Sequence, residues 1–309
     1  MRRLSVFLLA ASIVALPGPV AASGKGTPTC FGRPATIVGS GTIAGTAGDD
    51  VIVGSDGDDV IEGVGGNDRI CGLDGVDRLR GGIGNDRIDG GPTFDIIIGD
   101  VQAADDVLID GGNDLLLGGD GDDLMVGDSN SSFGSVRGIG GNDVIFGGAG
   151  DDGIFADNRG AGGGVSGRGG NDYVDGGPGA DGIGGDSLGA TESSDRGGND
   201  LLIGGDGDDF ITGDSGIFDL GTISGDGGND LVVGGSGSDV LLGDNSPVEG
   251  APTGDAGNDV LIAGSGDDDL VGDSRDDTTS TPSGRGRDVC RGDAGTDTAA
   301  LCEVTTGVH

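Results

Sequence analysis

Aspartate residues recur along this chain at intervals that could hold metal ions. From Gly45 the sequence reads GTAGDDVIV, GSDGDDVIE, GVGGNDRIC, GLDGVDRLR and GGIGNDRID without a gap, and the sixth residue of every unit is Asp. Carboxylates repeated this closely repel one another unless cations lie between them. Hard divalent cations, Ca²⁺ above all, take oxygen ligands of this kind. The pattern therefore predicts that the chain binds cations.

The period of nine continues beyond residue 98, where the nonapeptides occur in pairs followed by inserts of about 11 residues. About 20 units are present in all. The last two contain Asp288 and Asp297, but their neighbours depart from the pattern, so we assign no metal to them. The sixth-position aspartates that we predict as metal ligands are Asp50, Asp59, Asp68, Asp77, Asp86, Asp95, Asp114, Asp123, Asp143, Asp152, Asp172, Asp181, Asp200, Asp209, Asp230, Asp239, Asp259 and Asp268.

Each insert also opens on an aspartate, which predicts a third column along the molecule. These residues are Asp128, Asp157, Asp186, Asp214, Asp244 and Asp273. Position five separates the two members of a pair, because it is Asn in nearly all first members and Asp, Ala or Ser in most second members. The two turns of a coil are therefore not equivalent.

Each unit reads as a tight turn rich in Gly, Asp and Asn, followed by a strand of three residues whose middle side chain, at position eight, faces inward. Strands this short need neighbours, so successive coils must stack at roughly 4.8 Å and align each Asp above its predecessor. Two bare carboxylates about 5 Å apart repel by roughly 3 kcal/mol at an effective dielectric constant of about 20. We therefore expect the metal-free stack to be unstable.

The recurring GGxGxDxUx motif, where U is a large apolar residue, resembles the RTX or hemolysin-type calcium-binding repeats over roughly residues 45 to 300. The resemblance implies an all-β fold, a right-handed parallel β-roll or β-helix solenoid, in which Asp side chains and turn carbonyls share several Ca²⁺ ions. Family members often carry a C-terminal export signal, whereas this chain has an N-terminal one.

The inserts allow two interpretations, either loops on one edge of a two-sided roll or a third side of the coil, and we favour loops. Strands that follow the Asn-Asp turns are apolar at all three positions, as in Leu115–Leu117 and Leu231–Val233. This composition predicts that both faces of these strands are buried. The inserts would cover the outer face, or another chain would.

The termini predict an exported chain whose ends are held by disulfides. Residues 1–22 have the basic, apolar and small-residue regions of a signal peptide, followed by an N-terminal cap (23–44), contiguous repeats (45–98), paired repeats with inserts (99–300) and a C-terminal tail (301–309). We expect no membrane span. A stack of about ten coils separates its ends by roughly 45 Å. Cys30 can therefore reach Cys71, and Cys290 can reach Cys302, but no bridge can join the two ends.

Composition narrows the possible functions. The chain has 54 acidic and 16 basic residues and a net charge of −38, so it would repel nucleic acid and anionic lipid. Its one His is His309 at the end, which leaves no Ser/His/Asp or Cys/His constellation, and we expect no enzymatic activity. We expect a secreted calcium-binding protein with a structural or surface-associated role. The alternative is an extracellular adhesion protein, stiffened by calcium, that recognises an envelope partner through its inserts.

Overall fold

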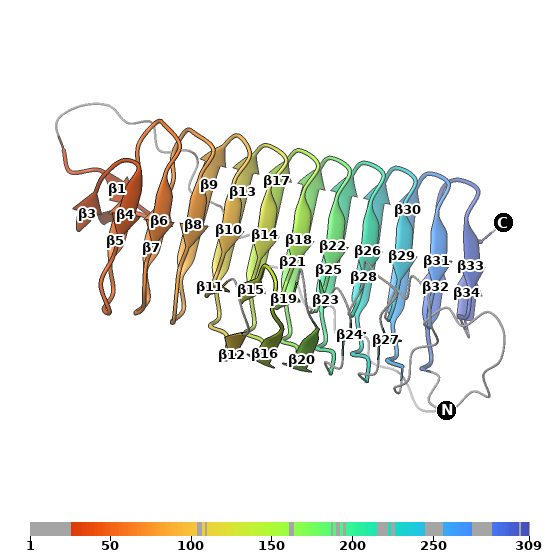
Figure 1. The fold of residues 1–309 in the computed structure, drawn as a ribbon. Coiled ribbons are helices and arrows are strands. Elements are labelled where there is room, and N and C mark those ends of the chain that lie inside the picture. Colours follow the sequence, from red (N-terminus) through yellow and green to blue (C-terminus); the bar gives the residue numbers. More distant parts are fainter. Residues whose placement is uncertain are drawn as a thin grey trace.

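The computed structural model describes residues 26–103, 107–108, 110–160, 164–186, 188–189, 192–193, 196–214, 222–223, 226–244, 256–273, 286–302 and 304–308. These residues form an all-β solenoid whose coils stack along one axis from the N-terminal to the C-terminal end (Figure 1). The predicted fold class is confirmed. The described residues contain no helix, and hence none able to cross a membrane. The predicted signal peptide, residues 1–22, lies outside them.

Two long parallel sheets form the sides of the solenoid. The first sheet has 12 strands: β3 (Ile37–Val38), β5 (Val51–Val53), β7 (Arg69–Cys71), β9 (Arg87–Pro92), β13 (Leu115–Asp120), β17 (Val144–Ala149), β21 (Tyr173–Pro178), β25 (Leu201–Asp206), β28 (Leu231–Ser236), β30 (Val260–Ser265), β32 (Val289–Arg291) and β34 (Val304–Thr306). The second sheet has 11 strands: β4 (Thr42–Ala44), β6 (Val60–Glu62), β8 (Arg78–Arg80), β10 (Ile96–Ile98), β14 (Leu124–Val126), β18 (Gly153–Phe155), β22 (Gly182–Gly184), β26 (Phe210–Thr212), β29 (Val240–Leu242), β31 (Asp269–Val271) and β33 (Thr298–Ala300). Alternate nonapeptides lie on opposite sheets, so Ile52 pairs with Ile70 while Ile61 pairs with Leu79.

The core is a file of position-eight side chains between the two sheets, as the sequence predicts. Ile52, Ile70 and Ile88 on the first sheet and Ile61 and Leu79 on the second are completely buried, and they belong to one continuous apolar cluster. Full burial of such a side chain stabilises the fold by about 1.5–3 kcal/mol. Each nonapeptide supplies only one of these side chains, so the core is narrow for a chain of 309 residues.

The outer face of the first sheet is more exposed than the sequence predicts. Val144 and Leu231 are each 36% exposed and Val260 is 37% exposed, although the residue that follows each of them is buried. The prediction that both faces of these strands are buried is therefore wrong. Side chains alternate along a strand, so positions seven and nine point away from the core whatever their hydrophobicity.

The inserts are strands, and the interpretation as loops is wrong for their described part. Two further parallel sheets run along the lower edge of the stack in Figure 1. One contains β11 (Gln102–Ala103), β15 (Asn130–Ser131), β19 (Arg159–Gly160) and β23 (Leu188–Gly189), and the other contains β12 (Val107–Leu108), β16 (Val136–Ile139), β20 (Val165–Arg168), β24 (Glu192–Ser193) and β27 (Thr222–Ile223). Inserts of nearly equal length stay in register, so the backbone of each pairs with the next, as between Val136 and Val165. We call this edge the insert lobe.

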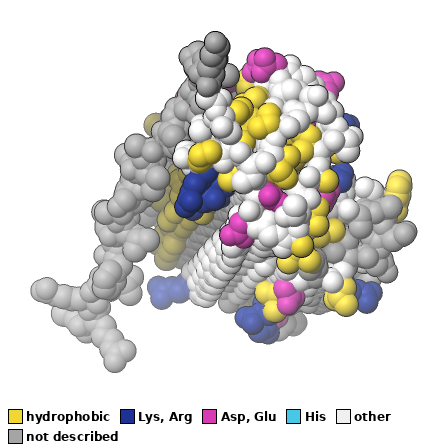
Figure 2. Space-filling view, turned by 90° about the vertical axis from the view of Figure 1, so that its left-hand side faces the viewer, with side chains coloured by type: hydrophobic (Ala, Val, Ile, Leu, Met, Phe, Trp, Pro, Cys, Tyr) yellow, Lys and Arg dark blue, Asp and Glu magenta, His cyan; other side chains and the backbone are white. Residues whose placement is uncertain are grey.

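Disulfides join the cysteines in the two predicted pairs. Cys30 bonds to Cys71, with 5.8 Å between their Cα atoms, and Cys290 bonds to Cys302, with 6.0 Å. Cys30 lies in β1 (Thr29–Cys30), which pairs antiparallel with β2 (Arg33–Pro34) at the N-terminal end. Apolar side chains gather on that end, which faces the viewer in Figure 2, while rows of white atoms run back along the stack. The first bridge therefore ties a cap to the exposed end of the solenoid.

Stacked turns leave no room for a side chain at several glycines. Gly205 has a φ of +126° and pairs with Gly177, and a Cβ at Gly205 would lie far inside 3.0 Å of the Gly177 carbonyl oxygen. Gly182 is the matched contrast, because the nearest atom to its Cβ would be 3.9 Å away. Both glycines lie in strands, so only the stacking contact and the backbone angle distinguish them.

We predict that Gly205→Ala destabilises the folded protein by about 1–3 kcal/mol or more, since overpacking and a left-handed backbone angle act together. Gly182→Ala should change stability by less than about 0.5 kcal/mol. Urea unfolding of both variants in saturating calcium, followed by circular dichroism, measures the difference. Equal midpoints for the two variants would contradict the close stacking of the turns.

Candidate metal centres

The predicted ligands form two columns, one before each long sheet. The first column is Asp50, Asp68, Asp86, Asp114, Asp143, Asp172, Asp200, Asp230, Asp259 and Asp288. The second column is Asp59, Asp77, Asp95, Asp123, Asp152, Asp181, Asp209, Asp239, Asp268 and Asp297. Every member is at most 8% exposed. Asp288 and Asp297 continue the columns despite the altered residues around them.

One oxygen of each column carboxylate is oriented by the neighbouring coil. The backbone N–H of Asp68 donates to Oδ1 of Asp86 at 2.7 Å, and that of Asp77 donates to Oδ1 of Asp95 at 2.8 Å. The same bond recurs from coil to coil, for example from the N–H of Asp143 to Oδ1 of Asp172 at 2.6 Å. Hydrogen bonds of this kind stabilise the ionised carboxylate and hold its second oxygen in one direction.

The second oxygen, Oδ2, is buried and receives no hydrogen bond in most of the two columns. This holds for Asp68, Asp77, Asp86, Asp95, Asp114, Asp123, Asp143, Asp152, Asp172, Asp181, Asp200, Asp209, Asp230, Asp239, Asp259, Asp268 and Asp297. A buried polar atom without a partner costs about 1–3 kcal/mol, and more when it is charged. A buried oxygen without a donor, repeated on most coils, is a candidate ligand for a cation.

Asp50 and Asp59, the first predicted ligands, differ from the others. Oδ2 of Asp50 accepts hydrogen bonds from the N–H and hydroxyl of Thr46 at 2.7 and 2.8 Å. Oδ2 of Asp59 accepts the equivalent bonds from Ser55 at 2.7 and 3.0 Å. At the N-terminal end, a hydroxyl residue at position two therefore donates to the Oδ2 atom that lacks a donor in later coils. These two carboxylates have the least need for a cation.

A glycine and a carbonyl oxygen line the space beside each Oδ2. A Cβ at Gly90 would lie 2.7 Å from the carbonyl oxygen of Gly118 and closer still to Oδ2 of Asp95. On the other column, a Cβ at Gly63 would collide with Asp68 and with the carbonyl oxygen of the next coil. The donor set is therefore carboxylate plus backbone carbonyl, without nitrogen or sulfur. Ca²⁺ prefers such oxygens and accepts about six to eight of them, whereas Zn²⁺ favours His and Cys. The residues present fit calcium.

Burial changes the acidity of the column carboxyls. Desolvation raises the pKa of Asp68 and Asp77 to about 6, that of Asp86 to about 7 and that of Asp95 to about 8. The backbone hydrogen bond to Oδ1 opposes this shift, while neighbouring aspartates increase it. Without a cation, these carboxyls therefore hold protons at a pH where free aspartate is ionised.

Asparagine at position five forms a separate ladder on the turns. Oδ1 of Asn113 accepts hydrogen bonds from the backbone N–H and side-chain amide of Asn142, both at 2.9 Å. The same pair of bonds joins Asn199 to Asn229 at 3.1 and 2.8 Å. These neutral ladders hold coils together without a cation. Within the described turns, the second members make only the backbone bond, as from the N–H of Asp151 to Oδ1 of Asp122 at 3.0 Å.

The aspartates that open the inserts are buried, which the sequence alone did not reveal. Asp128 and Asp157 are 0% exposed and Asp186 and Asp214 are 1% exposed. Asp100 occupies the same place in the first inserted coil and is also 0% exposed. The third column predicted from the sequence begins one coil later, at Asp128. The Gly-Asp pair that begins most inserts, and the Ala156-Asp157 pair that replaces it once, were the available signal. No three acidic, His or Cys side chains within the described ranges gather around one point.

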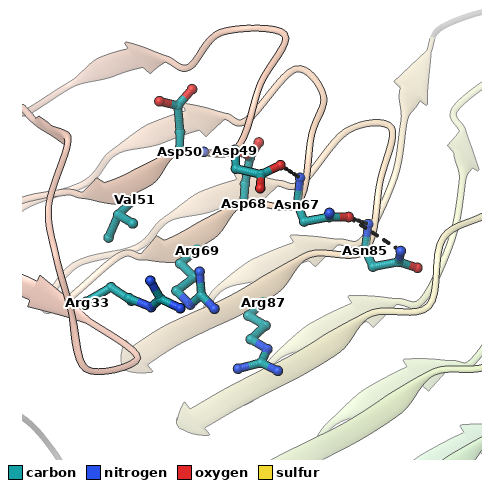
Figure 3. Close-up of a pocket in the computed structure, with 9 residues that line it drawn as sticks. All are labelled: Arg33, Asp49, Asp50, Val51, Asn67, Asp68, Arg69, Asn85 and Arg87. Carbon is teal, nitrogen blue, oxygen red and sulfur yellow. Dashed lines mark hydrogen bonds between the residues drawn. The ribbon is translucent and has the colours of Figure 1, made fainter.

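A pocket of about 390 Å³ lies at the N-terminal end of the first column. Asp50 and Asp68 belong to one side of it, and Arg33, Arg69 and Arg87 lie together on the other side (Figure 3). No ion pair joins these arginines to an acid within the described part of the chain. Their charges offset part of the negative potential of the column at this end. No His or Cys is among the described residues that line the pocket.

The fold and the columns together define the class of protein. A parallel β-solenoid with one core side chain per nonapeptide, and with buried carboxylates beside glycine carbonyls on successive coils, is a β-roll with candidate cation sites between its turns. The profile of the RTX calcium-binding nonapeptide repeat matches residues 38–70, 71–103, 104–132, 135–158, 165–187, 194–217, 222–245 and 253–278. The chain therefore belongs to this family of structural calcium-binding repeats. No curated protein matches the chain.

Proposed function

We propose that this protein is a secreted calcium-binding β-roll that folds when calcium binds and serves as a structural or surface-associated module. The observation that carries this proposal is the repeated, buried Oδ2 atom without a hydrogen-bond donor, as at Asp123 and Asp152. Desolvated carboxylates at this spacing are unfavourable unless a positive charge lies between the coils.

The sixth-position aspartates from Asp68 to Asp268 would hold the ions, together with carbonyl oxygens of the turn glycines. Bound calcium would supply positive charge and bridging coordination between coils. The chain itself orients each carboxylate through the N–H of the preceding coil and excludes water by close stacking of glycine. Asp50 and Asp59 would contribute least, because hydroxyl groups already satisfy their free oxygens.

An extracellular location suits both the chemistry and the cysteines. Extracellular calcium modules bind with dissociation constants of about 10⁻⁴–10⁻³ M, so the chain would stay unfolded at low cytosolic calcium and fold after export. Its two disulfides also favour an oxidising compartment. The N-terminal stretch has the composition of an export signal.

Limited proteolysis tests calcium-driven folding. In millimolar calcium the region from residue 45 to residue 300 should resist a protease that has no calcium requirement of its own, whereas dialysed, metal-free protein should be cut throughout. Magnesium at the same concentration should protect poorly, because Mg²⁺ demands octahedral geometry and dehydrates reluctantly. Equal protection in all three conditions would remove the basis of the proposal.

A second candidate function is recognition of a partner by the insert lobe. Two large apolar side chains stand out from this lobe, Leu108 at 83% and Phe133 at 79% exposed. A protein–protein contact commonly centres on such residues. The roll would then be a rigid scaffold that presents them.

Capture experiments from cell-envelope material separate the two functions. If the lobe recognises a partner, wild-type protein in calcium should retain it, the Leu108→Ser/Phe133→Ser variant should lose it, and Ile83→Ser should not. Ile83 is the control because it is 59% exposed on an uninserted turn. If no partner is retained in calcium, recognition by the insert lobe is rejected and the structural role is the one that remains.

A further inference from the structure

A third column of carboxylates lies where the insert lobe joins the roll. Five of its members lie two residues after a strand of the second sheet and are at most 1% exposed: Asp100, Asp128, Asp157, Asp186 and Asp214. They lie outside the sixth position of the GGxGxD turn. So many buried acids in one file require either protons or cations.

Alternate members of this third column keep one oxygen without a donor. Oδ2 of Asp157 accepts the N–H of Gly170 at 2.9 Å, and Oδ1 of Asp214 accepts the N–H of Gly228 at 2.7 Å. The other oxygen of each side chain, Oδ1 of Asp157 and Oδ2 of Asp214, is buried and receives no hydrogen bond. Asp100 repeats the arrangement, with the N–H of Gly112 on Oδ2 at 3.0 Å and Oδ1 without a donor.

Carboxylate oxygens from successive coils converge beside a glycine. A Cβ at Gly169 would lie 2.9 Å from Oδ2 of Asp157 and closer still to Oδ1 of Asp186. A Cβ at Gly197 would lie 2.9 Å from Oδ2 of Asp186 and closer still to Oδ1 of Asp214. The oxygens that meet at these two glycines each accept a glycine N–H as well, so the donor-free oxygens, Oδ1 of Asp157 and Oδ2 of Asp214, are the second oxygens of the same carboxylates.

The first column flanks the same turns. Oδ2 of Asp230 lies beside Gly213, the residue directly before Asp214, together with the carbonyl oxygen of Gly243. Burial raises the pKa of Asp214 well above its usual range, and the charge of Asp230 makes the next largest contribution. At Gly213 and Asp214, where an insert begins, carboxylate oxygens of the first and third columns therefore lie close to a backbone carbonyl oxygen.

We propose that the root of the insert lobe binds an additional file of divalent cations, Ca²⁺ by its donor set, shared between Asp157, Asp186, Asp214 and their equivalents in successive coils. This inference rests on the proposed calcium binding of the nonapeptide turns. Each ion would take at most two carboxylates of the third column, because no three acidic side chains converge among the described residues. Backbone carbonyls and water would complete its coordination. The ions would tie the lobe to the roll.

The competing explanation is a file of protonated carboxyl groups. Asparagine resembles a protonated aspartate, so Asp157→Asn/Asp214→Asn would preserve that arrangement but remove cation ligands. Asp152→Asn/Asp209→Asn is the matched change in the second column of the same coils. Asp151→Asn/Asp208→Asn is the charge-matched surface control, because those positions carry Asn in other repeats and their oxygens accept backbone N–H bonds at 2.8 and 2.7 Å.

Bound calcium per molecule, measured by equilibrium dialysis and atomic emission at saturating calcium, decides between them. The third-column pair should lose about two ions or more relative to wild type, and the surface control should lose none. An unchanged count in the third-column pair, with a loss in the second-column pair, would overturn the inference and leave calcium-driven folding intact. No calcium on any protein, wild type included, would reject the proposed function itself.

Wild-type crystals give a measurement that does not depend on whether a variant folds. Anomalous scattering from calcium, or from terbium in its place, should give peaks beside the donor-free Oδ1 of Asp157, near Gly140, and the donor-free Oδ2 of Asp214, near Gly227. The turns beside Gly147 and Gly204 are the internal reference, since they face Asp152 and Asp209 of the second column. Peaks at the reference turns without peaks at the lobe root would overturn the inference.

Discussion

Metal-free protein at about pH 7.5 should show the circular dichroism of a disordered chain and gain β-structure as calcium reaches the millimolar range. The reason is the imbalance between core and charge. Each nonapeptide buries one aliphatic side chain, such as Ile145 or Ile154, and one carboxylate, such as Asp143 or Asp152. Neighbouring carboxylates repel by roughly 3 kcal/mol per pair, which is as much as a buried aliphatic side chain contributes.

Calcium reverses this balance by mass action. A site occupied at ten times its dissociation constant stabilises the folded state by about 1.4 kcal/mol. Several such sites together reach the stability of a typical domain, about 5–15 kcal/mol. The transition should therefore be steep in calcium concentration, because occupied sites support their neighbours in the stack.

Magnesium and sodium chloride are the controls for the titration. Sodium chloride at matched ionic strength tests simple screening, and magnesium tests the geometry of coordination. Either salt restoring full β-structure would show that charge screening, and not a calcium site, stabilises the coils. Full β-structure in metal-free protein at neutral pH would contradict the expected result outright.

Acidification should partly replace calcium. Burial raises the pKa of Asp86 and Asp123 to about 7 and that of Asp95 to about 8, above the unfolded value of about 3.9. Groups raised in this way stabilise the folded state fully below about pH 4, and that contribution disappears as the pH rises to about 8. Metal-free protein should therefore gain β-structure between about pH 8 and pH 4.

Calcium-bound protein should respond to pH in the opposite direction. Protons compete with calcium for the same carboxylates, so calcium affinity should fall as the pH drops from about 8 to about 6, and binding near pH 6.5 should release protons. Calorimetric titration in two buffers of different ionisation enthalpy measures that release. The acidification experiment on metal-free protein needs dialysed samples, because chelators themselves lose calcium affinity in acid. Binding without proton release would show that the carboxyls are already ionised.

Much of the fold could be predicted from local pattern. The period of nine places Ile70 and Leu79 in the core and Asp68 and Asp77 in the columns, because an aliphatic residue recurs at position eight and Asp at position six. The cysteine pairing followed from the length of the stack. Asp50 belongs to the same pattern, yet the tertiary structure shows that Thr46 satisfies it, which depends on one hydroxyl at position two.

The inserts could not be predicted in the same way. The strands around Asn130 and Val136 are two and four residues long and have no hydrophobic alternation of their own. They form because the next insert offers backbone hydrogen-bond partners in register, and those partners are residues 28 to 30 apart in the sequence. Asp128 lies at the start of an insert, and it is buried because the insert lobe packs against the turn there.

The sequence by itself determined the period, the core file, the candidate oxygen ligands and the negative charge of the columns, since each of these depends on residue type at a fixed position within nine. Only the tertiary structure decided which oxygens lack a partner, how the inserts pair and where Asp157 and Asp214 lie. Those properties arise between coils, where stacking brings together atoms that no single repeat contains.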